Sequence, residues 1–563
     1  MKSKIQLLKA AGLVLGSLIL FSSFTTFGQA PAWQWAAGAG GTGYDWSNHI
    51  AVDTNGNSFS IGWFYSPYIT VGSDTLLNAD SSGNSTDIFI VKYDASGNVL
   101  WAKSAGGMSI EGGSGITTDL SGNAYITGSF LSSAVTFGSW TITNSGGYDM
   151  FLAKLDTYGN VLWAKSAAGS SNDDGQSVTT DAAGNLYLAG NFRSPAFTLD
   201  TITLINPGGA NSPYDIYIAR YDTSGTIVWA KSAGGTIGER IAGIAADANG
   251  NVYIVGDFES PNIGFDTIVL TNTGQQDIFI AKYDTSGNVL WAKSAAANGY
   301  ASCSAIAADV NGNTCITGSL YSTSITFDSI TLTNSGGAAT YVAKYNPSGN
   351  IIWAESTSST DIDYGTGICA DGNGNFYITG AFRNTITFGS TTLISPGGFD
   401  IFVAKYDSSG NVLWGKRAGN GKQDYGWSIV ADEFGMLYIT GTFSSQTINF
   451  GGTILTNSAP NSMETFVAKL DNVTGFDEEI NFHQTLNIYP NPVTNNFTIA
   501  FPNTVNKGAI EIYTILGKKI FKENITNISQ KEIHLKHIPG GIYFVKVWNG
   551  EKYFSNKIII QQN

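Results

Sequence analysis

The sequence predicts an all-β protein, a seven-bladed β-propeller closed by its N-terminal strand and followed by a small C-terminal β-sandwich. Three observations predict this fold. The phrase NVLWAKSAGG at residues 98–107 returns in near-copies, each copy fits a unit of four short strands, and the first and last units are incomplete in complementary ways. Such units bury their apolar faces only by packing on one another.

The first 30 residues have the pattern of a secretory signal peptide. Lys2, Lys4 and Lys9 precede the apolar stretch AAGLVLGSLILF, and small residues follow it. The apolar stretch is too short to span a bilayer, and no second one appears in the chain. We therefore expect residues 1–30 to direct export and the rest to carry no transmembrane anchor.

Three residue types recur at fixed spacing through residues 31–471. The recurring tryptophans are Trp35, Trp101, Trp163, Trp229, Trp291, Trp353 and Trp414. Eighteen residues after each comes an aspartate: Asp53, Asp119, Asp181, Asp247, Asp309, Asp371 and Asp432. Nine residues further on comes a glycine: Gly62, Gly128, Gly190, Gly256, Gly318, Gly380 and Gly441. All variation in repeat length falls after that glycine.

Each repeat fits four antiparallel strands. In the second repeat, SGITTD, NAYITGSF, DMFLAKLD and NVLWAKSA alternate as strands do. The turn sequence D-x-x-G-N joins strands one and two, and related turns join strands three and four, with glycine supplying the left-handed residue. Its Asp and Asn oxygens also suit calcium, but the further carboxylates of a calcium loop are missing, which favours a structural turn.

The incomplete repeats at the two ends indicate a ring. AWQWAAGAGG, beginning at Ala32, is a fourth strand without its first three, and ETFVAKLD, ending at Asp471, is a third strand without a fourth. An N-terminal strand that completes the final blade would close seven blades, whereas an open solenoid would need caps that the sequence lacks.

These strings resemble the bacterial β-propeller repeat family often called SBBP. The resemblance covers residues 31–471 and rests on Y-D-x-x-G-N-x-x-W and D-x-x-G-N-x-Y-I-T-G. It implies the propeller fold and no particular activity. In that fold we expect the seven tryptophans to pack between adjacent blades as core rather than as a sugar-binding stripe.

The charge distribution excludes one class of partner. The net charge of −14 understates the acidity of the repeats, because residues 1–29 contribute +3 and residues 484–563 contribute +5. A body near −22 repels phosphate backbones, so we expect no nucleic-acid partner.

The segments that cross from one blade to the next hold the candidate site. Ten residues after six of the seven tryptophans stands an acid: Asp45, Glu111, Asp173, Glu239, Asp363 and Asp424. Two interpretations remain open. The acids could ring the mouth of the central channel and bind a cation or a polyhydroxylated ligand, or each could bond backbone N–H groups where the chain enters the next blade. The ligand-binding candidates on this face are Asp45, Trp46, Glu111, Asp173, Glu239, Arg240, Asp363, Tyr364, Asp424 and Tyr425.

Irregular residues provide further candidates, since a ligand rarely needs seven identical contacts. They are Asp174, Arg193, Arg240, Asp257, Asp361, Arg383 and Lys422. No nucleophile elbow, zinc motif or phosphate-binding loop occurs, so we predict no catalytic residue, no metal centre and no cofactor, with calcium the one ion that the loop oxygens would suit. The sequence favours a secreted or cell-surface binding or adhesion propeller, and the alternative is a secreted glycosidase or lyase using acids of the crossover face.

Residues 472–484 read as a linker, and residues 485–563 predict six or seven short strands in a small β-sandwich. This segment resembles the type A C-terminal sorting domain of type IX secretion in Bacteroidota. The carriers of the resemblance are Tyr489, Pro490, Asn491, Pro492, Gly517, Gly541 and Tyr543. It implies passage through the outer-membrane translocon, removal by a sortase, and release or attachment to surface lipopolysaccharide.

Overall fold

We describe a computed structural model of the chain. It describes residues 31–167, 169–207, 213–359, 361–459, 462–471, 487–494, 496–514, 519–534, 538–548 and 553–561. The predicted signal peptide, the linker and Gly517 lie outside these residues. The chain divides into two compact units, Met1–Val473 and Thr474–Asn563, and each is described by itself.

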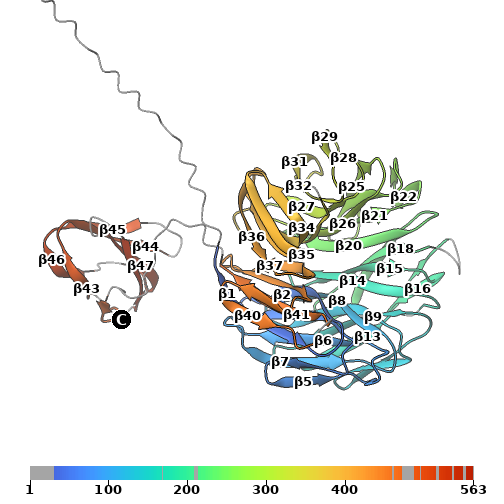
Figure 1. Ribbon diagram of the computed structural model, residues 1–563, viewed down its shortest axis with the longest axis horizontal. Helices are drawn as coiled ribbons and strands as arrows, with labels where there is room; N and C mark the ends of the chain where they lie inside the picture. The colour runs from blue at the N-terminus through green and yellow to red at the C-terminus, as the bar shows by residue number, and fades with distance from the viewer. Residues whose placement is uncertain are drawn as a thin grey trace, which may run out of the picture. The chain divides into compact units, whose positions relative to one another are not determined.

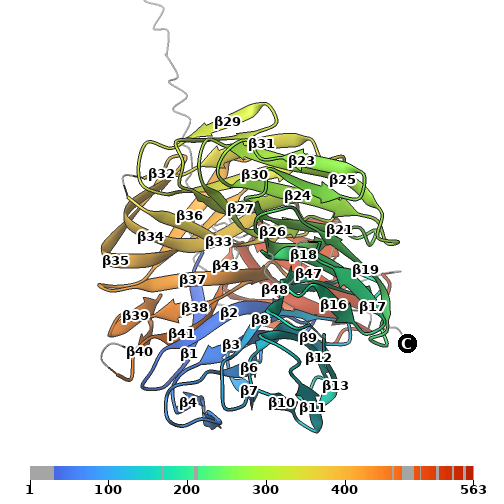
Figure 2. The same ribbon diagram turned by 90° about the vertical axis from the view of Figure 1, so that its right-hand side faces the viewer.

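In the described part of the large unit, seven antiparallel sheets each contain four principal strands. Figures 1 and 2 show these sheets following one another through the colours of the chain. The first strands are β2 (Asp45–Val52), β8 (Glu111–Thr118), β14 (Asp173–Thr180), β20 (Glu239–Ala246), β26 (Ala301–Ala308), β33 (Asp363–Ala370) and β37 (Asp424–Ala431). The second strands are β3 (Ser58–Phe64), β9 (Ala124–Phe130), β15 (Leu186–Phe192), β21 (Val252–Phe258), β27 (Thr314–Leu320), β34 (Phe376–Phe388) and β38 (Leu437–Phe443).

The third and fourth strands complete each sheet. The third strands are β6 (Asp87–Tyr93), β12 (Asp149–Leu155), β18 (Asp215–Tyr221), β24 (Asp277–Tyr283), β30 (Ala339–Tyr345), β35 (Thr391–Tyr406) and β41 (Glu464–Leu470). The fourth strands are β7 (Val99–Ala105), β13 (Val161–Ser166), β19 (Ile227–Ala233), β25 (Val289–Ala297), β31 (Ile351–Ser356), β36 (Val412–Ala418) and β1 (Trp33–Gly40).

Strand β1 pairs with β41, so the two ends of the repeats share one sheet. The pairing is antiparallel, with Ala37 opposite Val467 and Ala39 opposite Thr465. The first strands also contact one another in succession, β2 with β8 and so on to β37, and β37 contacts β2. The orange strands β38 and β41 accordingly lie beside the blue strand β1 in Figure 2.

Short hairpins fill most of the excursions between second and third strands. They are β4 (Tyr68–Val71) with β5 (Asp74–Leu77), β10 (Ala134–Phe137) with β11 (Trp140–Thr143), β16 (Ala196–Leu199) with β17 (Ile202–Ile205), β22 (Asn262–Phe265) with β23 (Ile268–Thr271), β28 (Ser324–Phe327) with β29 (Ile330–Thr333), and β39 (Thr447–Phe450) with β40 (Thr453–Thr456). Hairpins β4–β5 and β28–β29 pair with the fourth strand of the preceding sheet, and the short β32 (Ser358–Ser359) pairs with β34.

The recurring tryptophans join neighbouring sheets. The indole of Trp101, on β7, donates from Nε1 to the carbonyl of Thr157 at 3.1 Å, in the turn of the next sheet. In that turn a Cβ on Gly159, whose φ is +80°, would lie 2.9 Å from the Trp101 ring, so only glycine fits. Trp35, Trp229, Trp291 and Trp353 make the same type of hydrogen bond. The packing between sheets follows the sequence prediction.

Trp414 differs for a reason that lies in the topology. Its Nε1 has no hydrogen-bond partner among the described residues. The next sheet is the one that β1 completes, and its third and fourth strands come from opposite ends of the repeats. No tight turn joins them, so the carbonyl that the other indoles use is missing.

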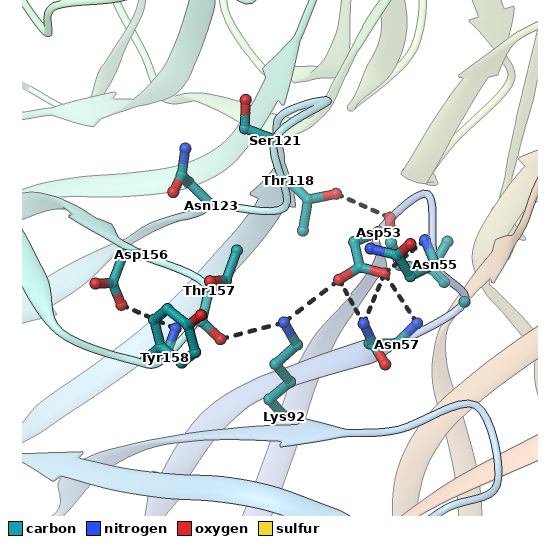
Figure 3. A network of polar contacts seen from close by, with 12 residues as sticks. Asp53, Asn55, Asn57, Lys92, Thr118, Ser121, Asn123, Asp156, Thr157 and Tyr158 are labelled. Atoms are coloured by element: carbon teal, nitrogen blue, oxygen red, sulfur yellow. Dashed lines mark hydrogen bonds and ion pairs between the residues drawn. The ribbon is translucent and has the colours of Figure 1, made fainter.

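Buried ion pairs add to the contact between sheets on the tight-turn side. Figure 3 shows Lys92 between Asp53 of its own sheet and Thr157 of the next. The Lys92 Nζ lies 3.4 Å from Asp53 Oδ2 and 3.3 Å from the Thr157 carbonyl oxygen. Asp53 also accepts the backbone N–H of Asn55 and Asn57, as the structural interpretation of the D-x-x-G-N turn requires.

The described part of the second unit consists of two sheets around one apolar core. One sheet contains β42 (Asn487–Tyr489), β43 (Asn496–Val505) and β46 (Ile528–His534). The other contains β44 (Gly508–Thr514), β45 (Lys519–Ile525), β47 (Gly541–Trp548) and β48 (Tyr553–Ile560). Alternate residues such as Ile510, Ile512, Val545 and Val547 are fully buried between the sheets, as in a β-sandwich.

Candidate functional site at the channel mouth

Each first strand of the large unit carries one extra residue relative to the second strand. In the first sheet Ser47 pairs with Gly62 and His49 with Ile61, which leaves Asn48 as a β-bulge. The bulged residues are Asn48, Ser114, Gln176, Ala242, Ser304, Thr366 and Trp427. All seven line a central cavity of about 600 Å³. The bulge therefore contributes one side chain per sheet to the cavity.

The repeated glycine of the second strand makes this bulge sterically feasible. A Cβ on Gly62 would lie 1.9 Å from the carbonyl oxygen of Trp46, and one on Gly128 would lie 1.9 Å from that of Gly112. The equivalent glycines of the other five sheets show the same approach, between 1.8 and 2.0 Å. Any side chain there would push the first strand away, so the fixed spacing from tryptophan to glycine reflects a backbone contact.

An arc of aromatic side chains lies at the end of the cavity where the first strands begin. This aromatic arc consists of Tyr321, Tyr364, Phe399, Tyr425, Trp427, Trp46 and Trp63. Neighbouring ring centroids are 4.9 to 6.4 Å apart along the whole series. Four of the six pairs are stacked, namely the three consecutive pairs from Tyr364 to Trp427 and the pair of Trp46 with Trp63. The arc runs through four adjacent sheets.

The aromatic arc has a charged contact at Phe399, its third ring. Arg383 forms an ion pair with Asp361, with its Nε 3.0 Å from Asp361 Oδ2, and its guanidinium lies 5.7 Å from the centroid of Phe399. This pair holds the pKa of Asp361 below its usual range, chiefly through the hydrogen bond from Arg383. The rings thus form a continuous surface with a fixed cation at one edge.

Polar side chains occupy the sheets on the other side of the mouth. This polar arc consists of Asp174, Asn191, Arg240 and Asp257. The Asn191 amide donates to Asp174 Oδ1 at 2.9 Å, and Arg240 Nη2 lies 3.5 Å from Asp257 Oδ2. Burial raises the pKa of both carboxyls to about 6, against the opposing effect of Asn191 on one and Arg240 on the other. The Arg240 side chain is 62% exposed and lines the cavity.

The six acids of the crossing segments face away from the mouth. Asp45, Glu111, Asp173, Glu239, Asp363 and Asp424 are all at most 2% exposed. Asp45 accepts the N–H of Gly41 at 2.8 Å and of Ser66 at 3.2 Å, and Asp424 accepts that of Asn420 at 2.9 Å. Their carboxylates therefore bond the chain where it enters each sheet, which is the second of the two interpretations above.

The structure divides the sequence-predicted site residues into two groups. Trp46, Tyr364 and Tyr425 belong to the aromatic arc and Arg240 to the polar arc, because each follows a crossing acid and points to the opposite face of its strand. The expectation that the acids themselves present carboxylates at the mouth does not fit their burial. Among the irregular residues, Asp174, Asp257, Asp361 and Arg383 do lie around the mouth.

The sequence pattern of the crossing acids does not point to Tyr321, Trp63 or Phe399, nor to the bulged residues as a class. The last were detectable in principle, because each stands thirteen residues after a recurring tryptophan. His49 next to the first bulge also lines the cavity. Its Nδ1 has no hydrogen-bond partner among the described residues, and burial lowers its pKa to about 4, so it is neutral at neutral pH.

The mouth combines two kinds of binding surface. Stacked aromatic rings bind the apolar faces of ring-shaped ligands, and the amide, guanidinium and carboxyl groups across the mouth donate and accept hydrogen bonds. A cavity of about 600 Å³ is in the range of small-molecule sites. Within the described residues no group of three or more His, Cys, Asp or Glu side chains is arranged to hold a metal.

The described sorting residues of the second unit lie on β42, in the segment before β43, and on β47 of the other sheet. Tyr489 ends β42 with 46% of its surface exposed. Asn491 Oδ1 accepts the N–H of Ile559 at 2.9 Å, and the Tyr543 hydroxyl donates to the carbonyl of Pro539 at 2.9 Å. Pro490 and Pro492 flank Asn491, and Gly541 begins β47.

Comparison with known proteins identifies the second unit. Residues 487–561 match the family described as "Secretion system C-terminal sorting domain". This match supports export to the cell surface or the medium and interaction with the type IX secretion machinery. In the part of the chain that the structure describes, there is no helix long and apolar enough to cross a membrane.

The repeats are similar to two curated proteins. An uncharacterized WD repeat-containing protein of Acanthamoeba polyphaga mimivirus is 27% identical over 515 residues, covering 74% of this chain and 36% of that protein. The Regulatory protein FlaEY of Caulobacter vibrioides is 25% identical over 292 residues, covering 48% of this chain and 30% of that protein. The chain thus spans about a third of the length of these relatives.

Among solved structures, a mutant of the Synechocystis apocarotenoid oxygenase is similar, with 9% identity and a TM-score of 0.36. The match covers 78% of this chain and 97% of that one.

Proposed function

We propose that the chain is an exported, non-catalytic binding protein whose large unit is a closed seven-bladed β-propeller. The pairing of β1 with β41 and the contact of β37 with β2 support closure. In a closed ring the seven bulged residues surround one channel, and the aromatic and polar arcs face each other across its mouth. The repeated spacing supports assignment to the SBBP-like repeats.

The proposed ligand is a glycan or another chain of hydroxylated rings, on a polysaccharide or on a glycosylated surface protein. The observation that carries this proposal is the pairing of seven contiguous aromatic rings with a hydrogen-bonding arc. A sugar ring has an apolar face that stacks on an indole or phenol and a rim of hydroxyls that bond amides and carboxyls.

The sorting domain gives this protein its place of action. We propose that it engages the type IX translocon and sortase, which would release the propeller or attach it to surface lipopolysaccharide. Tyr489, Pro490, Asn491, Pro492, Gly517, Gly541 and Tyr543 are the residues proposed for that recognition. The propeller would then meet its ligand outside the cell.

A glycan array probed with the full chain tests the binding proposal. We expect saturable binding to a subset of glycans that Trp427→Ala and Tyr425→Ala each weaken by at least about tenfold, since a stacked ring contributes on the order of 1–3 kcal/mol. Trp140→Ala is the matched control, because Trp140 lies on the outer hairpin β11 and is 42% exposed. Binding that both mouth variants retain would exclude the mouth as the site.

One observation favours the alternative of a carbohydrate-active enzyme. Asp174 and Asp257 flank Arg240 at the mouth with pKa values raised to about 6, and a raised pKa suits a general acid. Incubating bound glycans with the full chain and assaying for new reducing ends or unsaturated products separates the two functions. Turnover that Asp174→Asn or Asp257→Asn abolishes would replace the binding module with the enzyme.

A further inference from the structure

Three polar side chains recur where the chain crosses from one sheet to the next. The first is the acid that begins the first strand of a sheet. The second is an acid on the third strand of the preceding sheet. These second acids are Asp87, Asp149, Asp215, Asp277, Asp400 and Glu464. A serine follows the second strand in six sheets: Ser66, Ser132, Ser194, Ser260, Ser322 and Ser445. Five crossings therefore contain two buried carboxyls and a hydroxyl.

The crossing between β7 and β8 shows the geometry. Glu111 accepts the N–H of Gly107 at 2.9 Å on Oε2 and that of Ser132 at 2.9 Å on Oε1. Asp87 accepts the N–H of Ala79 at 2.8 Å on Oδ2, but its Oδ1 has no hydrogen-bond partner among the described residues. A Cβ on Gly106 would lie 1.9 Å from that Oδ1, so Asp87 packs on Gly106. Glu111 bonds the next residue, Gly107, so the two carboxylates contact consecutive residues of one crossing.

Both carboxyls of this crossing are almost wholly buried. Asp87 is 2% exposed and Glu111 is fully buried. Burial, opposed by the hydrogen bond from Ala79 and aided by the charge of Glu111, raises the pKa of Asp87 to about 6. An unpartnered carboxylate oxygen beside a second carboxylate is costly unless a positive charge or a proton meets it.

A crossing with only one acid provides an internal comparison. Between β25 and β26 the first-strand acid is replaced by Ala301. There the N–H of Ala297, which stands where Gly107 stands in the earlier repeat, donates to Asp277 Oδ1 at 2.9 Å. The N–H at this position thus serves Glu111 in one crossing and Asp277 in the other, and in the crossing with two acids Asp87 Oδ1 is left without a donor. Asp363, which is alone at its crossing, also keeps one oxygen without a donor among the described residues. The pair is tolerated although it forfeits a hydrogen bond.

At the crossing between β36 and β37 a positively charged side chain lies beside the pair of acids. Arg417 on β36 forms an ion pair with Asp400, beside Asp424. Arg417 stands three residues after its tryptophan, a position that is serine in five other repeats, as at Ser104, and Gly38 in the first. At this crossing the chain itself supplies a cation to Asp400 Oδ2, while Asp400 Oδ1 has no hydrogen-bond partner among the described residues.

We propose that each crossing with two acids and no arginine binds a hard divalent cation such as calcium. The four crossings pair Glu464 with Asp45, Asp87 with Glu111, Asp149 with Asp173, and Asp215 with Glu239. In the last, Glu239 Oε1 is also buried and has no hydrogen-bond partner within the part of the chain that the structure describes. Two carboxylates and a serine hydroxyl form an all-oxygen set, which suits calcium rather than zinc.

Calorimetry on the chelated full chain tests this inference directly. On titration with calcium chloride we expect about four bound ions per chain and a rise in the unfolding temperature of about 5 °C or more at millimolar calcium. Absence of bound calcium, together with an unchanged unfolding temperature, would overturn the proposal. So would stabilisation by lowering the pH from 8 to 6 with no response to calcium, because a shared proton would then meet the pair.

Variants locate the ions and keep the test independent of folding. Ser104→Arg places a guanidinium where Arg417 stands, so it should displace one ion while the chain stays as stable as the calcium-bound parent. Asp87→Asn should likewise remove one ion, and Asp277→Asn, at a crossing with a single acid, should leave the ion count unchanged. An unchanged count in both Ser104→Arg and Asp87→Asn would refute the assignment. The readout is stoichiometry, so failure of glycan binding would not affect it.

Discussion

Replacing Gly62 by alanine tests whether the repeated glycine shapes both the ring and the mouth. The added Cβ would lie 1.9 Å from the carbonyl oxygen of Trp46 and 2.9 Å from Cε1 of Phe89. A carbon and an oxygen need roughly 3.2 Å, so the first strand must move away by more than 1 Å or the sheet must distort. Trp46 forms part of the aromatic arc, so that movement also changes the binding surface.

The magnitude follows from overpacking in a rigid interior. Insertion of a methyl group into a close-packed site costs typically 1–3 kcal/mol, and here the contact is with backbone, which cannot rotate away. We expect Gly62→Ala to lower the free energy of unfolding by about 3 kcal/mol or more. Urea unfolding followed by tryptophan fluorescence is suitable, because twelve of the thirteen tryptophans lie in residues 31–471.

Gly264→Ala is the matched control for this prediction. Nothing lies within 4 Å of a Cβ built on Gly264, in hairpin β22, and its backbone is not left-handed. We expect that variant to unfold within about 0.5 kcal/mol of the parent. Equal stability of Gly62→Ala and Gly264→Ala would refute the argument that a carbonyl contact fixes the glycine, and with it the explanation of the bulge.

Three further predictions concern buried charge and export. Burial raises the pKa of Asp215, Glu239 and Asp363 to about 7, above the value near 4 of the unfolded chain. The stability that these carboxyls contribute is therefore present below pH 4 and is lost as the pH rises through 7. In the presence of a chelator the unfolding temperature should fall from pH 5 to pH 8, and a rise would contradict this. Lys92→Met leaves the carboxylate of Asp53 buried without its cation and should lower the free energy of unfolding, measured in urea, by about 3 kcal/mol. Lys293→Met, whose ion pair is about one-third exposed, should lower it by less than about 1 kcal/mol. Similar losses in the two variants would contradict the distinction between buried and exposed pairs. Deletion of residues 485–563 should retain the protein in the periplasm, measured by fractionation, and normal surface delivery would remove the sorting assignment.

The four-stranded units could be predicted from the sequence because their determinants are local. Alternating side chains predict strands, and D-x-x-G-N predicts the turns between them. The fixed distance from Trp101 to Gly128 covers one crossing and the first hairpin of the next sheet, and the packing of Trp101 follows from its size and repetition. These features need no knowledge of neighbouring repeats.

The site was harder to predict because neighbours in space come from different repeats. Asp45 and Trp46 are adjacent in the chain, but side chains alternate along a strand, so that of Asp45 lies in the crossing and that of Trp46 at the mouth. Phe399 joins the arc from the long third strand β35, and Trp63 joins it from a second strand. The bulged position has no common residue type, ranging from Ala242 to Trp427, so its shared role appears only in the sheet register.

A density map of the large unit tests the central claim most directly. We predict seven four-stranded sheets around one channel, with Trp33–Gly40 as the outer strand of the sheet that holds Glu464–Leu470 and with the aromatic and polar arcs at the same end of the channel. A different number of sheets, a gap between the first and last repeats, or an N-terminal strand paired elsewhere would contradict it and remove the proposed mouth.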